Sequence, residues 1–366
     1  MQATKGNQIL NFICRWFVGL VFIFSGFVKA VDPMGTAFKI SEYMTAWGIG
    51  DFTFEWALPL ATPLSVALVT IEFTIGILLI TNSLRLLHSW VLLLMMLFFT
   101  GSTLIDAITN KVTDCGCFGD AIKLTNWQTF WKNIVLLIPT IIIFIQRKMG
   151  PRRKLERESL VAIITAACVI IFALWNINNE PCIDFRAWKV GNQMMPFGEE
   201  LQVKSFVTYK NKTTDAITEF ESKYLMDSMK VEGWTDNWEF VDSRVEDPYE
   251  IAADGFAMLG PDADDYAKDI IGNPGYVLIG TIHHLDKVNE EGVRAITQTH
   301  NFCVENGINF VLLTSALDED IQAFLFENKL EEIIYYFADA TAIETMLRSN
   351  PGFILLKDAK VMGKWH

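Results

Sequence analysis

Five apolar runs occupy the first half of the chain, and they restrict its fold more than any other feature of the sequence. They cover residues 9–31, 60–81, 86–108, 127–145 and 159–177. Each approaches the ~20 residues that a helix needs to cross the hydrocarbon core of a bilayer. One such run could be a buried soluble helix, but five in succession indicate a multi-pass membrane protein. No small-residue cleavage site follows Lys29, so we interpret the first run as a retained helix rather than a signal peptide.

The charge of the chain divides where these runs end. Residues 1–176 hold 14 Lys and Arg against 10 Asp and Glu, a net charge of +4, whereas residues 177–366 hold 16 against 33, a net charge of −17. The whole-chain net charge of −13 and the 51% hydrophobic content are therefore averages of two unlike parts. This division predicts a membrane domain followed by an acidic, water-soluble domain. The absence of a basic stripe argues against binding of nucleic acid.

Loop charges predict how the chain is oriented in the membrane. Residues 147–158 carry six basic and two acidic side chains, which is typical of a cytoplasmic loop. The loops at 32–59 and 109–126 carry six acidic residues and fit the outer side. Alternation then predicts a cytoplasmic N-terminus and a periplasmic C-terminal domain on a bacterial inner membrane, with the lipid bilayer as the first partner.

Charged side chains inside the runs are the first candidate functional residues. Glu72 stands near the middle of its run, where a carboxylate costs at least ~2.5 kcal/mol and is not expected to face lipid. Lys29 and Arg15 are the cations available to pair with it. Both also stand near the ends of the first run, where long side chains reach the interface. Glu72 is therefore either a proton or ligand site or a packing bond between helices, and the two cations belong to that site or act as anchors.

Three of the six cysteines fall in segments predicted to lie on the outer, periplasmic side of the membrane. Cys115 and Cys117 flank Gly116 in the loop after the third run, and Cys182 follows the fifth run. Thiols on the oxidising side of a membrane form disulfides. A Cys-X-Cys ring is tight and its bond is readily reduced, which favours a redox-active pair. The alternatives are a structural bridge from the loop to Cys182 and free thiols, and without a neighbouring His no metal is expected.

Residues 9–146 resemble the DoxX/MauE group of four-helix membrane proteins. The matching residues are Arg15, Ser25, Gly26, Lys29, Glu72, Gly76, the string Cys115-Gly-Cys-Phe-Gly119, Trp127 and Asn133. The resemblance implies a four-helix bundle akin to that of vitamin K epoxide reductase and of quinone-linked disulfide oxidases. In those relatives an outer cysteine pair exchanges electrons with a quinone or a thioredoxin-like partner, so a quinone is the implied cofactor. Those enzymes carry Cys-X-X-Cys at a helix end, whereas this chain has Cys-X-Cys in a loop.

Strand and helix patterns alternate from residue 275 onward. Strands are expected at 276–282, 309–314 and 333–337, helices at 290–306, 318–328 and 341–348, and a final hairpin at 349–365. This alternation predicts a sheet with a parallel core and an antiparallel edge. Shorter alternating stretches at 203–209 and 238–242 predict a hairpin or a small sheet.

The α/β pattern resembles a periplasmic, membrane-tethered thioredoxin-like domain. The resemblance rests on Asn350-Pro-Gly-Phe-Ile-Leu-Leu356 and Gly363-Lys-Trp365. It implies that Pro351 is the cis-proline before the fourth strand of that fold, with an ordinary strand-start proline as the alternative. A working thioredoxin has Cys-X-X-Cys after its first core strand, where this chain reads Thr281-Ile-His-His-Leu-Asp286. No dithiol exchange is expected there, and His283 and His284 are either loop residues or a ligand or proton site.

The expected fold is an all-α four-helix membrane bundle with a linking transmembrane helix, joined to an α/β thioredoxin-like domain with a β-rich insertion. Residues 1–146 form the DoxX/MauE-like domain, and residues 147–177 form the basic cytoplasmic loop and the fifth helix. Residues 178–270 form a linker and a β-rich subdomain, and residues 271–366 form the thioredoxin-like domain.

Two functions are compatible with this organisation. The first is thiol–disulfide chemistry, or maturation of envelope proteins, through the Cys115/Cys117 loop. The second is a non-catalytic scaffold or assembly factor whose degenerate thioredoxin-like domain binds an envelope partner protein. A small-molecule transporter is disfavoured, because a four-helix bundle of this type leaves little room for a pathway.

Overall fold

The computed structural model describes residues 5–47, 54–110, 112, 116–122, 124–148, 154–198, 203–230, 233–253 and 255–365, and leaves the side chains of 54–59, 227, 228 and 235 aside. The chain divides into two compact units, residues 1–186 and residues 187–366. Each unit is described by itself.

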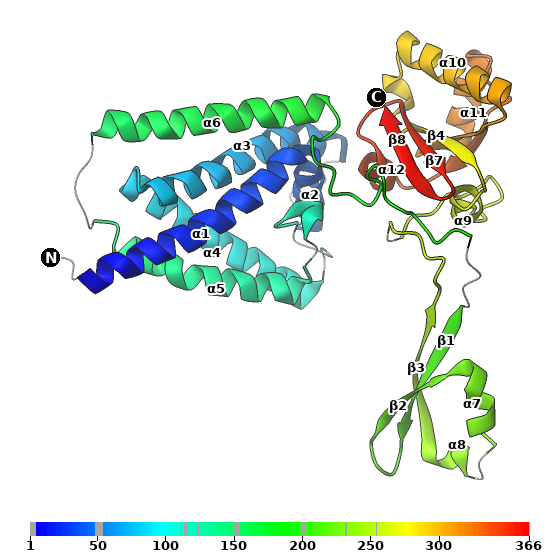
Figure 1. The fold of residues 1–366 in the computed structure, drawn as a ribbon, viewed down its shortest axis with the longest axis horizontal. Coiled ribbons are helices and arrows are strands. Elements are labelled where there is room, and N and C mark those ends of the chain that lie inside the picture. Colours follow the sequence, from blue (N-terminus) through cyan, green and yellow to red (C-terminus); the bar gives the residue numbers. More distant parts are fainter. Residues whose placement is uncertain are drawn as a thin grey trace. The chain divides into compact units, whose positions relative to one another are not determined.

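The first unit is built from long helices (Figure 1). Its helices are α1 (Lys5–Val31), α2 (Pro33–Ala46), α3 (Phe54–Thr81), α4 (Arg85–Thr109), α5 (Asn126–Ile145) and α6 (Leu155–Asn178), with the 3-10 turn η1 (Gly119–Ala121) before α5. Within the described residues, five of these helices are long and apolar enough to cross a membrane, namely α1, the part of α3 from Leu60, α4, α5 and α6. The five predicted apolar runs are thereby confirmed as helices of membrane-spanning length.

Helix α2 was not predicted, and local chemistry explains why it forms. Asp32 caps its first turn by accepting a hydrogen bond from the Gly35 backbone N–H at 3.0 Å. Pro33 stands at its first position, where proline needs no hydrogen-bond donor. The helix is too short to cross a bilayer, so it adds a cap to the bundle rather than another span.

Small residues bring α1 and α3 into close contact. A Cβ atom placed on Gly26 would lie 2.8 Å from the backbone nitrogen of Phe73, and one on Gly76 would lie 2.8 Å from the backbone nitrogen of Ile23. Only glycine permits this approach, which is a common way for membrane helices to associate. Helix α6 packs beside them, where the rings of Phe27 and Phe172 stack.

The second unit contains a five-stranded sheet with the strand order β6-β5-β4-β7-β8. Its strands are β4 (Tyr276–Ile282), β5 (Asn309–Thr314), β6 (Ile334–Phe337), β7 (Gly352–Lys357) and β8 (Lys360–Trp365). Strands β4, β5 and β6 are parallel, whereas β7 and β8 pair in antiparallel fashion. This arrangement confirms the predicted parallel core with an antiparallel edge.

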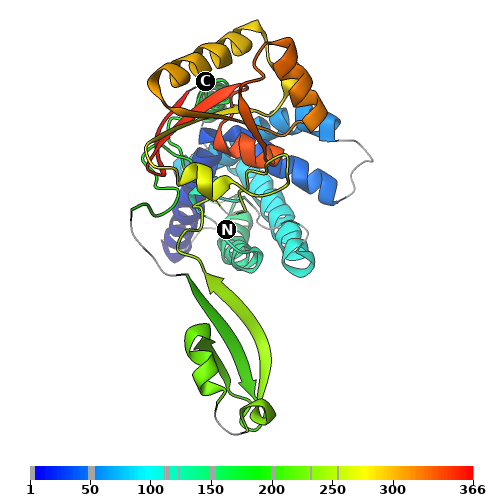
Figure 2. The ribbon, with the colours of Figure 1, turned by 90° about the vertical axis from the view of Figure 1, so that its right-hand side faces the viewer.

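Helices cover both faces of this sheet (Figure 2). Helices α10 (Glu290–Asn306) and α11 (Asp318–Glu327) pack on one face, around Ile296 and Ile321. Helices α9 (Ala267–Ile271) and α12 (Ala340–Met346) pack on the other face, around Ile271 and Ile343. Alternate strand residues therefore point into two separate cores.

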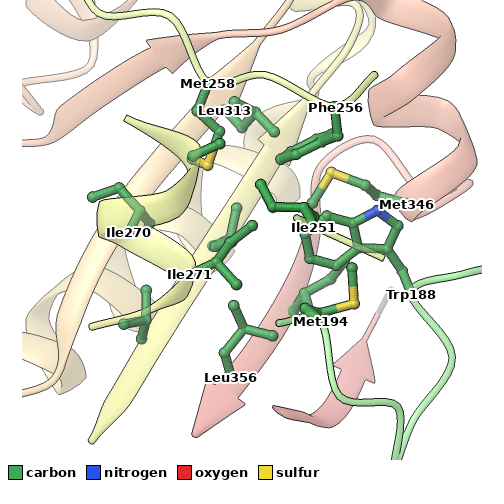
Figure 3. Close-up of a cluster of buried hydrophobic side chains, with 14 of the residues drawn as sticks. Trp188, Met194, Ile251, Phe256, Met258, Ile270, Ile271, Leu313, Met346 and Leu356 are labelled. Carbon is green, nitrogen blue, oxygen red and sulfur yellow. The ribbon is translucent and has the colours of Figure 1, made fainter. Parts of the chain in front are cut away.

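Residues from 178–270, the segment predicted as a linker and β-rich subdomain, contribute to the core beneath α9 and α12. Trp188, Met194, Ile251 and Phe256 lie among the strand residues beneath α9 and α12 (Figure 3). Trp188 is only 1% exposed and its ring meets that of Phe256 edge to face. The compact α/β unit therefore begins near residue 187 rather than at residue 271.

A small antiparallel sheet is inserted in this unit. Its strands are β1 (Lys204–Asn211), β2 (Ile217–Glu221) and β3 (Trp238–Glu246), in the order β2-β1-β3, with the short helices α7 (Ser222–Ser228) and α8 (Trp234–Asn237) between β2 and β3. Aromatic rings from all three strands and α8 contact one another and form its core: Tyr209, Phe220, Trp234, Trp238 and Phe240.

Candidate functional site at the end of the first helix

A buried ion pair joins α1 to α3. The Nζ atom of Lys29 lies 2.8 Å from Oε2 of Glu72, and the two side chains are 8% and 5% exposed. The Lys29 ammonium also lies 5.9 Å from the centre of the Phe99 ring of α4. Of the two cations that the sequence offered to Glu72, the structure therefore brings Lys29 to it.

Arg15 lies apart from this pair. Its guanidinium donates to Asn11 Oδ1 and to the backbone carbonyl of Leu79, both at 2.8 Å. Fourteen residues of helix separate Arg15 from Lys29, which is about 21 Å along the axis at 1.5 Å per residue. Arg15 consequently ties α1 to the end of α3 and does not join Lys29 and Glu72.

The loop that contains Cys117 is held against α1, one helical turn from the ion pair. The hydroxyl of Ser25 donates to the backbone carbonyl of Cys117 at 2.6 Å. Ser25 and Lys29 are four residues apart, so they share one face of the helix. The ring of Phe118 packs on Phe24 at 5.5 Å, and the ammonium of Lys132 lies 4.5 Å from the centre of the same ring. Cys115, the other member of the predicted pair, lies outside the described residues.

The segment with Cys182 is held near the same end of α1. Asn176 of α6 donates to the carbonyl of Ala30 at 3.1 Å and accepts from the backbone N–H of Cys182 at 3.3 Å. The anchor of Cys182 and the anchor of Cys117 are thus five residues apart on one helix. The sulfur of Cys182 is exposed, whereas Cys14 is buried within the bundle.

Arg186 closes the segment that follows α6. It is 2% exposed and pairs with Asp184 at 2.8 Å and with Glu180 at 2.7 Å. Burial would lower the pKa of its guanidinium, but the hydrogen bond and the charge of Asp184, together with Glu180 and Asp32, raise it. Arg186 is therefore charged, and it fixes the turn that presents Cys182.

Two further polar residues at this end of the bundle had no role in the sequence analysis. The hydroxyl of Tyr43 in α2 donates to Asp106 Oδ2 at 2.6 Å. Asn126 of α5 donates to the backbone carbonyl of Val112 at 2.8 Å. The contact between Tyr43 and Asp106 depends on how α2 lies across α4, which the sequence does not report. The only sequence signal for Tyr43 was its place in the loop before the second run.

In the second unit, polar side chains gather where β4 ends. The side-chain oxygen of Asn350 accepts from the backbone N–H of His283 at 2.9 Å and of His284 at 3.2 Å. His284 Nε2 lies 3.9 Å from Oε1 of Glu344, which is 8% exposed. The Asn350–Pro351 peptide bond is cis.

Burial sets the ionisation of this second group of residues. It lowers the pKa of His283 to about 4, and the neighbouring His284, Lys287 and Arg348 act in the same direction. Burial also lowers the pKa of His284 and raises the pKa of Glu344. His283 is therefore neutral near pH 7.

A Cβ on Gly292 would lie 2.7 Å from Cδ of Pro351, so α10 packs directly on this proline. No group of three or more His, Cys, Asp or Glu suited to a metal ion occurs in the described part of either unit.

Comparison with known proteins finds one similarity, and it lies in the first unit. No curated protein and no solved structure matches the chain. One family model does match, and it covers Arg15, Lys29, Glu72 and the Cys117 loop. Residues 7–146 match the family described as methylamine utilisation protein MauE, and this part of the chain is therefore similar to a MauE membrane domain.

Proposed function

We propose that the membrane unit carries out thiol–disulfide exchange through Cys115 and Cys117 at the periplasmic face of a bacterial inner membrane. The observation that carries this proposal is the anchoring of the Cys117 loop on Ser25, one helical turn from the buried pair of Lys29 and Glu72. A fixed loop presents its thiols in one position, and the adjacent ion pair keeps the helices beneath it together. Cys182, anchored near the same helix end, is a third thiol for the exchange.

The exchange transfers two electrons and two protons from a partner protein to the cysteine pair. A thiolate of the partner attacks one sulfur of the Cys115–Cys117 disulfide, whose bond breaks as a mixed disulfide forms. The second thiolate of the partner then attacks the mixed disulfide, closes the partner's own disulfide and leaves Cys115 and Cys117 as thiols. The partner class is therefore an envelope protein with a dithiol.

The resemblance to quinone-linked enzymes implies a quinone as the group that accepts these electrons. A quinone ring has two carbonyl oxygens, which need hydrogen-bond donors in a buried site. Trp47 Nε1 and Thr74 Oγ1 are buried donors that have no hydrogen-bond partner in the described part of the chain. Both donors belong to the membrane unit, and we propose them as the candidate groups that hold the quinone oxygens. When bound, it supplies an acceptor for two electrons and two protons.

Trapping of thiols in intact membranes tests the redox proposal. Rapid acid quenching followed by alkylation with a mass-tagged maleimide should show Cys115 and Cys117 in both oxidised and reduced forms. Cys115→Ser or Cys117→Ser should accumulate a mixed disulfide with a partner. Cys168→Ser, which removes an exposed cysteine of α6, is the matched control. Thiols that stay reduced and form no mixed disulfide under any condition would overturn the proposal.

A second candidate function is a membrane scaffold whose thioredoxin-like domain binds a partner protein. It is favoured by the sequence Thr281–Asp286, which places histidines where a working thioredoxin has cysteines, and by the packing of α10 on Pro351. The double variant Cys115→Ser/Cys117→Ser separates the two functions. A scaffold retains the phenotype of the normal chain and a stable co-purifying partner in this variant, whereas a thiol–disulfide enzyme loses the phenotype.

A further inference from the structure

A lysine of α2 lies along the residue that separates the two loop cysteines. Gly116 has a φ angle of +60°, and a Cβ atom built on it would lie 3.3 Å from Lys39 Cγ and 3.7 Å from Lys39 Cε. The Lys39 ammonium is bonded to that Cε atom, so the stem and the charge of Lys39 both lie at the loop. The backbone conformation of Gly116 favours glycine, and a larger side chain there would also crowd Lys39.

The ammonium of Lys39 forms an ion pair with Glu42, which belongs to the same helix. Lys39 Nζ lies 2.7 Å from Glu42 Oε2, and the two side chains are 22% and 41% exposed. Four other charged side chains among the described residues lie near the loop. Lys132 lies on the Phe118 ring, Lys29 and Glu72 pair with each other, and Asp120 belongs to the following turn η1. Among the described residues, Lys39 is the cation that lies against Gly116. Glu42 weakens its field, and Asp106 of α4 also interacts electrostatically with both side chains.

We propose that Lys39 stabilises the thiolate of Cys117 and that Glu42 limits this stabilisation. The thiolate, rather than the thiol, is the nucleophile in disulfide exchange, and a neighbouring cation favours it. On ionisation the Cys117 proton passes to water, and the negative charge stays on sulfur beside the Lys39 ammonium. The use of this thiolate in exchange rests on the proposed function, but the electrostatic effect does not depend on it.

Alkylation of the reduced, full-length chain in detergent tests the inference. All variants carry Cys115→Ser, so that Cys117 cannot reoxidise within the loop. The rate of modification of Cys117 by iodoacetamide near pH 7 is measured by mass spectrometry, with Cys182 of the same molecules as the internal reference. We expect Lys39→Gln to lower the Cys117/Cys182 rate ratio roughly three-fold and Glu42→Gln to raise it roughly two-fold, as for a unit charge a few ångströms away in a wet site.

The pH dependence and two further variants separate electrostatics from a change in loop structure. Lys39→Gln should move the rise of the Cys117 rate to higher pH, whereas Lys39→Arg should restore it. Lys132→Gln removes a cation of α5 that contacts the same loop at Phe118, and should change the ratio less than Lys39→Gln does. The inference is overturned if Lys39→Gln and Glu42→Gln leave the ratio unchanged or move it in the same direction. Failure of the redox proposal would appear instead in the trapping experiment, with these rates unaffected.

Discussion

The two units differ in how they treat buried charge. In the membrane unit Lys29 and Glu72 form a closed pair at 2.8 Å. In the α/β unit, His284 and Glu344 at the end of β4 are farther apart, at 3.9 Å. The neighbouring His283 Nδ1 has no hydrogen-bond partner among the described residues. Burial lowers the pKa of His283 to about 4 and raises that of Glu344. The Lys29–Glu72 pair holds its two charges by pairing them, whereas burial disfavours the charged forms of His283 and Glu344.

This difference indicates where charge-dependent chemistry can take place. A helix in lipid has no water with which to solvate a lone charge, so a buried charge there needs an opposite charge or backbone carbonyls as partners. The pair lies one turn from the Cys117 loop, whereas the group at β4 has neither a thiol nor a fixed charge pair. The thiol chemistry proposed above therefore belongs to the membrane unit rather than to the end of β4.

The largest expected effect comes from breaking the buried pair. Lys29→Met leaves the Glu72 carboxylate buried without its cation, and should destabilise the membrane unit by about 3–5 kcal/mol. The double variant Lys29→Met/Glu72→Leu removes both charges and should recover most of this loss. Thermal stability in detergent, followed by size-exclusion chromatography, measures both. A double variant that is no more stable than the single one would show that the pair does not act as a unit.

Close packing of α1 on α3 should give the next largest effect. Gly26→Ala places a methyl group 2.8 Å from the Phe73 backbone nitrogen, which forces the helices apart. We expect a loss of about 1–3 kcal/mol, typical of overpacking. Gly101→Ala is the matched control, since nothing lies within 4 Å of that position. The control should gain up to ~1 kcal/mol from helix propensity. Equal effects of the two substitutions in the same thermal assay would contradict the described contact.

The ionisable groups near β4 should make the α/β unit sensitive to acid. The pKa of His283 falls from 6.5 to about 4 on folding, so the unfolded state binds more protons between these values. The stability that neutral His283 provides is full above pH 6.5 and is lost as the pH falls towards 4. The unsubstituted unit should lose roughly 1–3 kcal/mol of stability to this effect between pH 6.5 and 4, and His283→Gln should abolish that loss.

Glu344 should act with the opposite sign, because its pKa is raised in the folded state. The stability linked to its protonated form is full at low pH and declines as the pH rises above the usual carboxyl range. Glu344→Gln should therefore make the loss in acid steeper, whereas His283→Gln makes it shallower. Urea denaturation of residues 187–366 across pH 4–7 checks both variants. Curves that run parallel to the unsubstituted one would exclude this account.

Much of the α/β unit was readable from the sequence because its signals are local. Strand β4 and helix α10 have the predicted bounds, 276–282 and 290–306. Asn289 caps the start of α10 by accepting from the Gly292 N–H, and Gly307 ends it in the left-handed conformation. By contrast, Trp188 lies in a polar stretch, and its burial comes from contacts with residues far away in sequence. No local pattern reports such a contact.

The candidate site also contains residues that local sequence reveals and residues that only the tertiary structure reveals. Lys29 and Glu72 were identifiable because charges inside apolar runs are costly and must find partners. The role of Ser25 could not be identified from the sequence, since its hydrogen bond to the Cys117 carbonyl depends on how the loop folds over α1. Lys39 was hidden for the same reason. Helix α2 has too little hydrophobic content to stand out in the loop, and its Asp32-Pro33 start was the only available signal.

The smallest effect is expected where an ion pair is exposed, and it sharpens the comparison with Lys29 and Glu72. Arg244 of β3 contacts Glu219 of β2 at 2.6 Å, a distance shorter than that of the buried pair, but both side chains are more than one third exposed. Water and salt screen such a pair, and ordering its long side chains opposes the attraction. Arg244→Gln should therefore change the unfolding midpoint of residues 187–366 very little, and the change should vanish in 1 M salt. A loss as large as that of Lys29→Met would mean that short distance, rather than burial, determines the value of an ion pair in this chain.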